Sequence, residues 1–92
     1  MATIPFDALE EALQISNSVR DGLTASIYTH DPVAAHRFAQ EVQSGMVWVN
    51  DSLSHIPGMS LGGVKDAGVG REESFDELLS CTESKSVTMR FS

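Results

Sequence analysis

The residues that could do chemistry in this chain are few, and they lie far apart. Cys81 is the single cysteine, and the three histidines are His30, His36 and His55. Their spacing fits no metal site. No histidine or basic residue lies close to Cys81 in sequence, and Glu83 nearby disfavours a thiolate, so we expect a buried or half-buried cysteine without a catalytic role. The chain therefore predicts no self-sufficient catalytic set.

The glycines gather in one stretch, because five of the seven lie between residues 50 and 70. Gly68 and Gly70 supply the first two glycines of a dinucleotide-binding turn, but Glu72 and Glu73 follow where a pyrophosphate would bind. We therefore expect a turn that leads into a helix, since acidic side chains suit a helix start. A stretch this long without periodicity is typical of a functional loop.

The sequence before this stretch alternates between strand and helix patterns. Asp7 and Glu10 have the spacing of a capping box, which predicts a helix that ends in a turn at Gly22. Asp31 followed by Pro32 has the pattern of a second helix start. The expected elements are strands at 4–6, 23–29 and 46–49 and helices at 7–21 and 31–45, the order of an α/β fold with parallel strands.

Two further elements are expected after the glycines. A helix over 71–81 would place Phe75, Leu78 and Leu79 on one face, and residues 85–91 alternate as a half-buried strand does. This last strand has no evident partner in the chain, and the short parallel strands leave sheet edges uncovered. The predicted fold class is α/β, a partial parallel sheet with flanking helices that ends in an unpartnered strand.

Charge and composition exclude several function classes. The chain has 92 residues, with 13 acidic and 6 basic side chains and a net charge of −7, so nucleic acid and anionic membranes are disfavoured as partners. No apolar run approaches the roughly 20 residues that span a bilayer. The first residues lack the pattern of a signal peptide, and a single cysteine favours a reducing compartment. We expect a cytoplasmic protein.

Five motifs follow one another along the chain. They are PFDALEEA at 5–12, DGLTASIYTHD at 21–31, SGMVWVN at 44–50, GGVKDAGVGRE at 62–72 and TESKSVT at 82–88. In this order and with this spacing they resemble the C-terminal part of the NAD(P)-dependent aldehyde dehydrogenase family. The resemblance covers nearly the whole chain.

The resemblance implies an oxidoreductase. In the family a cysteine attacks the aldehyde, hydride passes to NAD or NADP, and a glutamate activates the water that releases the acid. None of these parts matches a position in this chain, so we expect no catalysis and no cofactor for the chain alone. Residues 1–84 would belong to the catalytic domain, with a substrate-anchor and glycine-rich loop at 51–70, and residues 85–92 would form an oligomerisation strand.

The resemblance also implies that this chain forms one wall of the substrate tunnel. Leu61 stands where the family commonly has a phenylalanine that packs on the aldehyde's tail, which would widen or reshape the tunnel. Asp51, His55 and Ile56 are weaker candidates for lining it. Cys81 stands where the family often has an aromatic residue, away from the nucleophile's position.

A subunit interface is implied as well. Arg71 and Glu83 match family positions that brace the dimer through charge pairing. Val87, Met89 and Phe91 would lie on one side of a final strand that pairs across subunits. The implied partners are the remaining part of the dehydrogenase, its sister subunits in a dimer or tetramer, and a small aldehyde.

Two other functions stay open on the sequence. The chain could be a stand-alone interaction module that docks on full-length dehydrogenase subunits through its last strand, which predicts that intact enzyme co-purifies with it. It could also be a small autonomous ligand-binding α/β domain, which predicts a sharp cooperative melt without partners.

Overall fold

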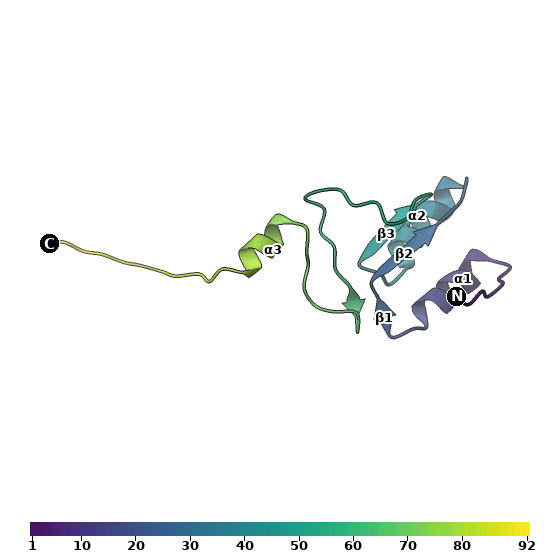
Figure 1. Cartoon of the computed structure of the whole chain (residues 1–92), viewed down its shortest axis with the longest axis horizontal. Coiled ribbons are helices and arrows are strands. Elements are labelled where there is room, and N and C mark those ends of the chain that lie inside the picture. The colour runs from purple at the N-terminus through teal and green to yellow at the C-terminus, as the bar shows by residue number, and fades with distance from the viewer.

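Two short parallel strands form the centre of the computed structural model, which describes residues 1–92 (Figure 1). Strand β2 (Thr24–Ile27) and strand β3 (Met46–Val49) pair along their whole length. Helix α2 (Pro32–Glu41) connects them. This arrangement confirms the predicted alternation, because a parallel pair needs a crossover that returns the chain to the same end of the sheet.

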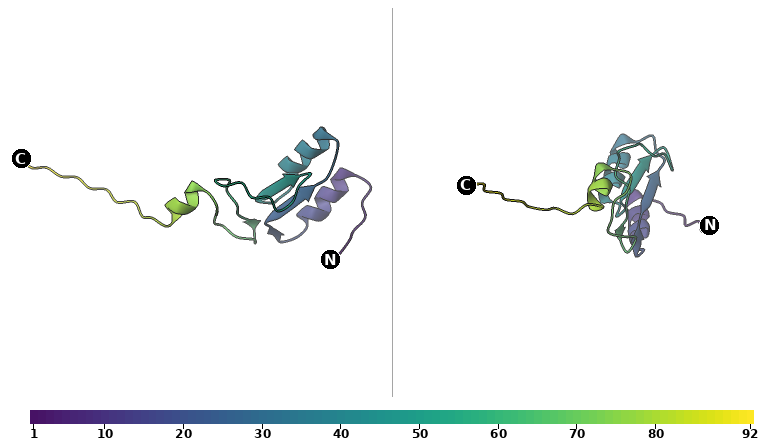
Figure 2. Two further views of the ribbon diagram at one scale, coloured as in Figure 1. Left: turned by 45° about the horizontal axis from the view of Figure 1, so that its top comes forward. Right: turned by 60° about the vertical axis from the view of Figure 1, so that its left-hand side comes forward.

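Helix α1 (Leu9–Asn17) and α2 cover the same face of these strands, and a small core lies between them (Figure 2). Its centre consists of Leu13, Phe38 and Val42, which are between 5% and 7% exposed. The partly buried side chains packed around it come from α1 and from both strands: Leu9, Ala25, Ile27 and Val47. The core is thus one layer between a helix pair and a two-stranded sheet.

The start of α2 confirms the cap that the sequence predicts. Asp31 is extended, its carboxylate accepts a hydrogen bond from the Val33 N–H at 2.9 Å, and Pro32 occupies the first helical position. The carboxylate satisfies one of the N–H groups that a helix start leaves without a partner.

The capping box predicted for α1 is wrong. Ala8, not Asp7, is the N-cap, and it makes no side-chain hydrogen bond. The Asp7 N–H instead donates to the Glu11 carboxylate at 3.0 Å. The Glu10 side chain turns away to Arg37 on α2, because an ion pair between the helices competes with the local cap.

Both helices end earlier than expected, α1 at Asn17 and α2 at Glu41. Gly22 does not end a helix; it lies in strand β1 (Asp21–Gly22), which pairs antiparallel with strand β4 (Val64–Lys65). The sequence did not predict this pair. Gly22 is required there by close packing, because a Cβ atom on it would lie 2.2 Å from the Gln43 carbonyl oxygen.

Helix α3 (Phe75–Ser80) begins later than the expected residue 71. Glu73 has a φ of 60°, in the left-handed region, so the helix cannot run through it. Glu72 and Glu73 therefore precede the helix. Its three apolar side chains are between 50% and 68% exposed and find no cover within the chain: Phe75, Leu78 and Leu79.

Residues 83–92 leave the body as an extended chain (Figures 1 and 2). The half-buried strand expected at 85–91 is not formed, because no other strand pairs with it, and the short strand expected at 4–6 is also absent. Cys81, at the base of the tail, is exposed and not buried as expected. The radius of gyration is 18.9 Å, against about 12 Å for a compact chain of this length. None of the helices is long and apolar enough to cross a membrane.

Candidate functional site

The segment expected to anchor the substrate, residues 51–61, is tied to the chain that follows the glycines. We call residues 51–61 the anchor loop. The Leu61 N–H donates to the Glu72 carbonyl at 3.0 Å, and the Glu72 N–H donates back at 2.6 Å. The Gly58 N–H donates to the Glu73 carbonyl at 3.1 Å. These bonds hold the second half of the loop against residues 72 and 73.

Asn50 sets the direction in which the anchor loop leaves β3. Its side chain accepts from the Thr29 N–H at 2.8 Å and donates to the Thr29 carbonyl at 3.0 Å. The carboxyl ends of β2 and β3 are thereby joined. Asn50 has a φ of 56°, a conformation that asparagine tolerates better than most residues, and the chain turns there into the loop.

Asp51 holds the first turn of the anchor loop together. Its carboxylate accepts hydrogen bonds from the Ser54 hydroxyl and from the Ser52 N–H. The Ser54 hydroxyl, followed by the Ser52 N–H, holds the pKa of the Asp51 carboxyl below its usual value. The Trp48 indole N–H donates to the Ser54 carbonyl at 2.9 Å, so β3 is fastened to the same turn. Trp48 is half-buried beside the loop.

His55 faces Glu73 across the loop. Its Nδ1 lies 2.8 Å from a Glu73 carboxylate oxygen, and its ring centroid lies 6.4 Å from that of Trp48. His55 and Glu73, together with Pro57 and Gly58, line an open cleft of about 330 Å³. His55 is therefore placed by two neighbours and still reaches a cleft.

Leu61 lies in a different cleft, of about 410 Å³, between the glycine-rich stretch and α3. Arg71 and the exposed Cys81 line the same cleft. Asp51, His55 and Ile56 do not, and Ile56 is 59% exposed. The four residues expected to line the tunnel thus fall into separate places along the anchor loop.

Arg71 closes the glycine-rich stretch. Its Nη1 donates to the carbonyls of Gly63 and Gly70, each at 2.9 Å. One side chain therefore joins the two ends of the turn that contains Gly68. Arg71 was expected to pair with a neighbouring subunit, but its Nη1 makes these hydrogen bonds within the chain.

The glycines of this stretch differ in their surroundings, since a Cβ atom on Gly68 or Gly70, the candidates for a dinucleotide turn, would meet nothing within 4 Å. A Cβ atom on Gly62 would lie 2.3 Å from the Gly70 carbonyl oxygen, and one on Gly63 would lie 2.5 Å from the Ala67 Cβ. The space beside Gly62 and Gly63 is therefore occupied by the chain itself. Helix α3 has only six residues and carries Asp76 and Glu77 in its first turn, which repel a pyrophosphate. No group of three or more His, Cys, Asp or Glu side chains could hold a metal ion.

Of the five residues expected at an interface, Arg71 is half-buried and the other four are exposed. Glu83 lies in the extended tail and forms no ion pair with Arg71. Val87, Met89 and Phe91 are 62%, 71% and 92% exposed, in the segment that extends away from the rest of the fold (Figure 1).

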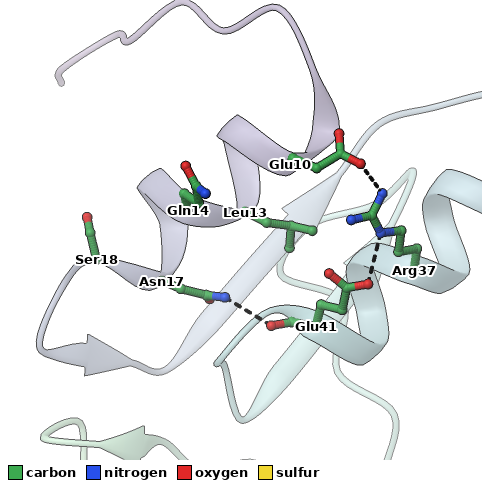
Figure 3. A pocket seen from close by; sticks show the side chains of 7 residues that line it. All are labelled: Glu10, Leu13, Gln14, Asn17, Ser18, Arg37 and Glu41. Carbon is green, nitrogen blue, oxygen red and sulfur yellow. Dashed lines mark hydrogen bonds and ion pairs between the residues drawn. The ribbon is translucent and has the colours of Figure 1, made fainter.

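A polar groove between α1 and α2 was missed by the sequence reasoning (Figure 3). Arg37 contacts the carboxylates of Glu10 and Glu41, the latter at 2.8 Å. The Glu41 and Glu10 carboxylates raise the pKa of the Arg37 guanidinium, which in turn holds the pKa of Glu10 below its usual value. Asn17 donates to the Glu41 carbonyl at 3.0 Å and accepts from the Gln43 N–H at 2.8 Å.

This groove joins two helices and does not present a reactive group. Each carboxylate of its ion pairs faces the one arginine, and the asparagine caps the end of α2. The spacing of Arg37 and Glu41, four residues apart on one helix, was the only part that the sequence could have indicated.

Known proteins match this chain in sequence and in structure. The model of the aldehyde dehydrogenase family matches residues 1–87. Aldehyde dehydrogenase tropH of Talaromyces stipitatus is 42% identical over 89 residues, which cover 97% of this chain and 17% of that protein. A putative aldehyde dehydrogenase from Burkholderia cenocepacia superposes with a TM-score of 0.83 at 39% identity, over 89% of this chain and 17% of that chain.

A further solved structure carries ligands. The indole-3-acetaldehyde dehydrogenase AldA of P. syringae, in complex with NAD+ and IAA, superposes with a TM-score of 0.82 at 38% identity, over 89% of this chain and 17% of that chain. The chain therefore spans less than a fifth of the length of the proteins that it matches. The family model nevertheless covers almost all of it, so the chain belongs to the aldehyde dehydrogenase family, whose members are oxidoreductases.

Proposed function

We propose that the chain is the C-terminal part of an NAD(P)-dependent aldehyde dehydrogenase, in which it forms one wall of the substrate tunnel and part of a subunit interface. The observation that carries this proposal is the anchor loop, which backbone bonds hold against Glu72 and Glu73 while its large apolar side chains stay exposed. A loop that is fixed on one side and exposed on the other suits a wall that another part of the enzyme completes. The reactive cysteine, the general base and the cofactor site would lie in that other part.

The side chains of the anchor loop support an apolar substrate contact. Leu53, Ile56 and Met59 are 76%, 59% and 52% exposed, and all three lie within eleven residues of sequence. Apolar side chains gathered on one exposed loop are typical of a binding surface. In this proposal they and Leu61 exclude water around the aldehyde's tail.

The exposed area supports a chain that completes its packing elsewhere. It amounts to 7525 Å², whereas a compact monomer of 9.9 kDa exposes about 5,200 Å². A standard interface covers about 800 Å² on each partner. The difference, about 2,300 Å², is more than twice that. It would suffice for contacts with both the rest of the catalytic domain and a sister subunit.

A fusion tests this function. The C-terminal stretch of AldA is replaced by residues 1–92, and oxidation of indole-3-acetaldehyde with NAD+ is measured. We expect activity in the fusion, none in AldA without its C-terminal stretch, and none in the 92-residue chain alone. Turnover by the isolated chain would refute the proposal that the reactive cysteine, the general base and the cofactor site lie in another part of the enzyme. A fusion that assembles to the size of AldA but stays inactive would refute the tunnel wall.

An interaction module is the second candidate, and the exposed tail is the observation that favours it. Phe91 is 92% exposed at the end of an extended chain whose N–H and C=O groups have no partners. Such a chain can add a strand to the sheet of another protein. Co-purification of an intact dehydrogenase with the tagged chain, weakened by Val87→Pro, would support this candidate. Capture of no dehydrogenase would count against it.

A further inference from the structure

We infer that Glu73 is a positioning residue for the anchor loop, acting through His55 and Gly58. This inference rests on the proposed function, because it assigns Glu73 to the substrate wall. The sequence reasoning placed Glu73 only at a helix start. The structure places it before the helix, facing the middle of the loop.

Glu73 contacts the anchor loop at two points. Its carboxylate lies 2.8 Å from Nδ1 of His55, and its carbonyl accepts from the Gly58 N–H at 3.1 Å. A carboxylate at Nδ1 favours the proton on that nitrogen and fixes the orientation of the ring. The stretch between the two points carries Ile56 at its centre. Glu73 thus sets where this exposed apolar side chain lies.

Glu73 is itself held in place. Its N–H donates to a Glu77 carboxylate oxygen at 2.9 Å, which links it to the first turn of α3. The next residue on the other side, Glu72, is bonded to Leu61 in both directions. The carboxylate of Glu73 therefore projects from a fixed backbone, and it can transmit that position to His55.

The backbone of Glu73 gives an independent argument. Its φ of 60° lies in the left-handed region, which glycine adopts at less cost than any other residue. The position would suit a glycine better on backbone grounds alone. A charged side chain at this position, in contact with His55, is explained if the side chain serves the loop and not the fold.

Trp48 provides the measurement, since it is the only tryptophan in the chain. Its indole N–H is bonded to the carbonyl of Ser54, the residue before His55, and its ring lies 6.4 Å from the imidazole. Movement of the loop changes both the exchange rate of the indole N–H and the emission of the ring. Both signals come from the single side chain of Trp48, which is bonded to the anchor loop.

The experiment compares Glu73→Gly, Glu73→Gln and the control Asp76→Asn. Glycine removes the carboxylate and relieves the backbone, glutamine keeps an acceptor for His55, and Asp76 is an exposed acid without a side-chain partner. In the 92-residue chain, we expect Glu73→Gly to speed indole N–H exchange by about 1.5- to 5-fold, the range of an exposed ion pair. Glu73→Gln should have a smaller effect, and Asp76→Asn none. The urea midpoint of Glu73→Gly should equal or exceed that of the parent.

The same variants are then placed in the AldA fusion. We expect Glu73→Gly to raise the KM for the aldehyde by about 2- to 5-fold with kcat unchanged within about 2-fold, since uniform binding and not chemistry is affected. Hydrogen exchange of the peptide over residues 50–61 in the fusion gives the loop measurement in the assembled state. Unchanged exchange in both settings, or loss of stability in step with the loop effect, would overturn the inference.

The two proposals fail in different ways. If the loop loosens in Glu73→Gly but the KM of an active fusion stays constant, Glu73 holds the loop and the loop is not part of the aldehyde site, so the tunnel wall is refuted. If the fusion is active and the loop does not respond, only the role of Glu73 is refuted.

Discussion

Gly45 and Gly62 cross so closely that Gly45 has no room for a side chain. A Cβ atom on Gly45 would lie 1.5 Å from the Gly62 carbonyl oxygen and 3.2 Å from the Gly63 Cα. The end of the turn before β3 is therefore pressed against the start of the glycine-rich stretch. This crossing explains the glycine at position 45, whereas Gly62 is packed against Gly70 and Arg71.

Gly45→Ala should destabilise the chain. The obstacle is backbone and cannot move aside as a flexible side chain would, so we expect a cost of about 1–3 kcal/mol in the free energy of unfolding. Gly70→Ala is the matched control, because a Cβ atom there meets nothing within 4 Å. Urea denaturation of both variants measures the difference. Equal midpoints for Gly45→Ala and the parent would show that the crossing is looser than described.

The predictions that succeeded depend on signals within a few residues of sequence. Asp31 and Pro32 started α2 as expected, and the apolar run from Met46 to Val49 is β3 with the expected bounds. The predictions that failed depend on contacts far along the chain. The Glu10 side chain pairs with Arg37 and does not cap its own helix. Strand β1 forms because a segment more than forty residues later lies beside it.

The site was predictable only in part, for a similar reason. The resemblance singled out Leu61 and His55, and the structure ties both to the segment after the glycines. It could not indicate Glu73, whose role depends on a φ of 60° and on the fold of the loop opposite. The strand predicted at 85–91 is not formed in this chain, and its pairing with another subunit stays a prediction.

Glu10→Gln should lower stability in a pH-dependent way. The hydrogen bond from Arg37 lowers the pKa of Glu10 from 4.5 in the folded chain, so the folded chain binds the proton more weakly than the unfolded chain. The carboxylate therefore contributes stability above pH 4.5 that is lost as the pH falls through the folded pKa. We expect a small deficit in the urea midpoint of the variant at pH 7 that disappears in acid. Glu72→Gln, an acid without a side-chain partner, should show no such convergence with the parent.

Removal of residues 85–92 should leave the fold intact and change the assembly. These residues extend away from the helices and strands (Figure 1), so the free energy of unfolding of the shortened chain should match that of the parent within about 0.5 kcal/mol. In the AldA fusion, we expect the shortened form to elute as a smaller assembly. Substituting serine at Val87, Met89 and Phe91 should have the same effect, since it removes the apolar side of the strand. An unchanged elution of the shortened form would show that the tail is not part of the interface.

Leu61→Phe should shift the preference of the AldA fusion toward smaller aldehydes. Leu61 is half-buried and its backbone is bonded on both sides to Glu72, so a larger side chain must extend into the cleft of about 410 Å³. We expect the ratio of kcat/KM for indole-3-acetaldehyde to that for acetaldehyde to fall about 5-fold, which corresponds to about 1 kcal/mol. Val69→Phe adds the same ring at a side chain that is fully exposed and should leave the ratio unchanged. Equal ratios in both variants would place the aldehyde's tail away from Leu61, even in a fusion that is fully active.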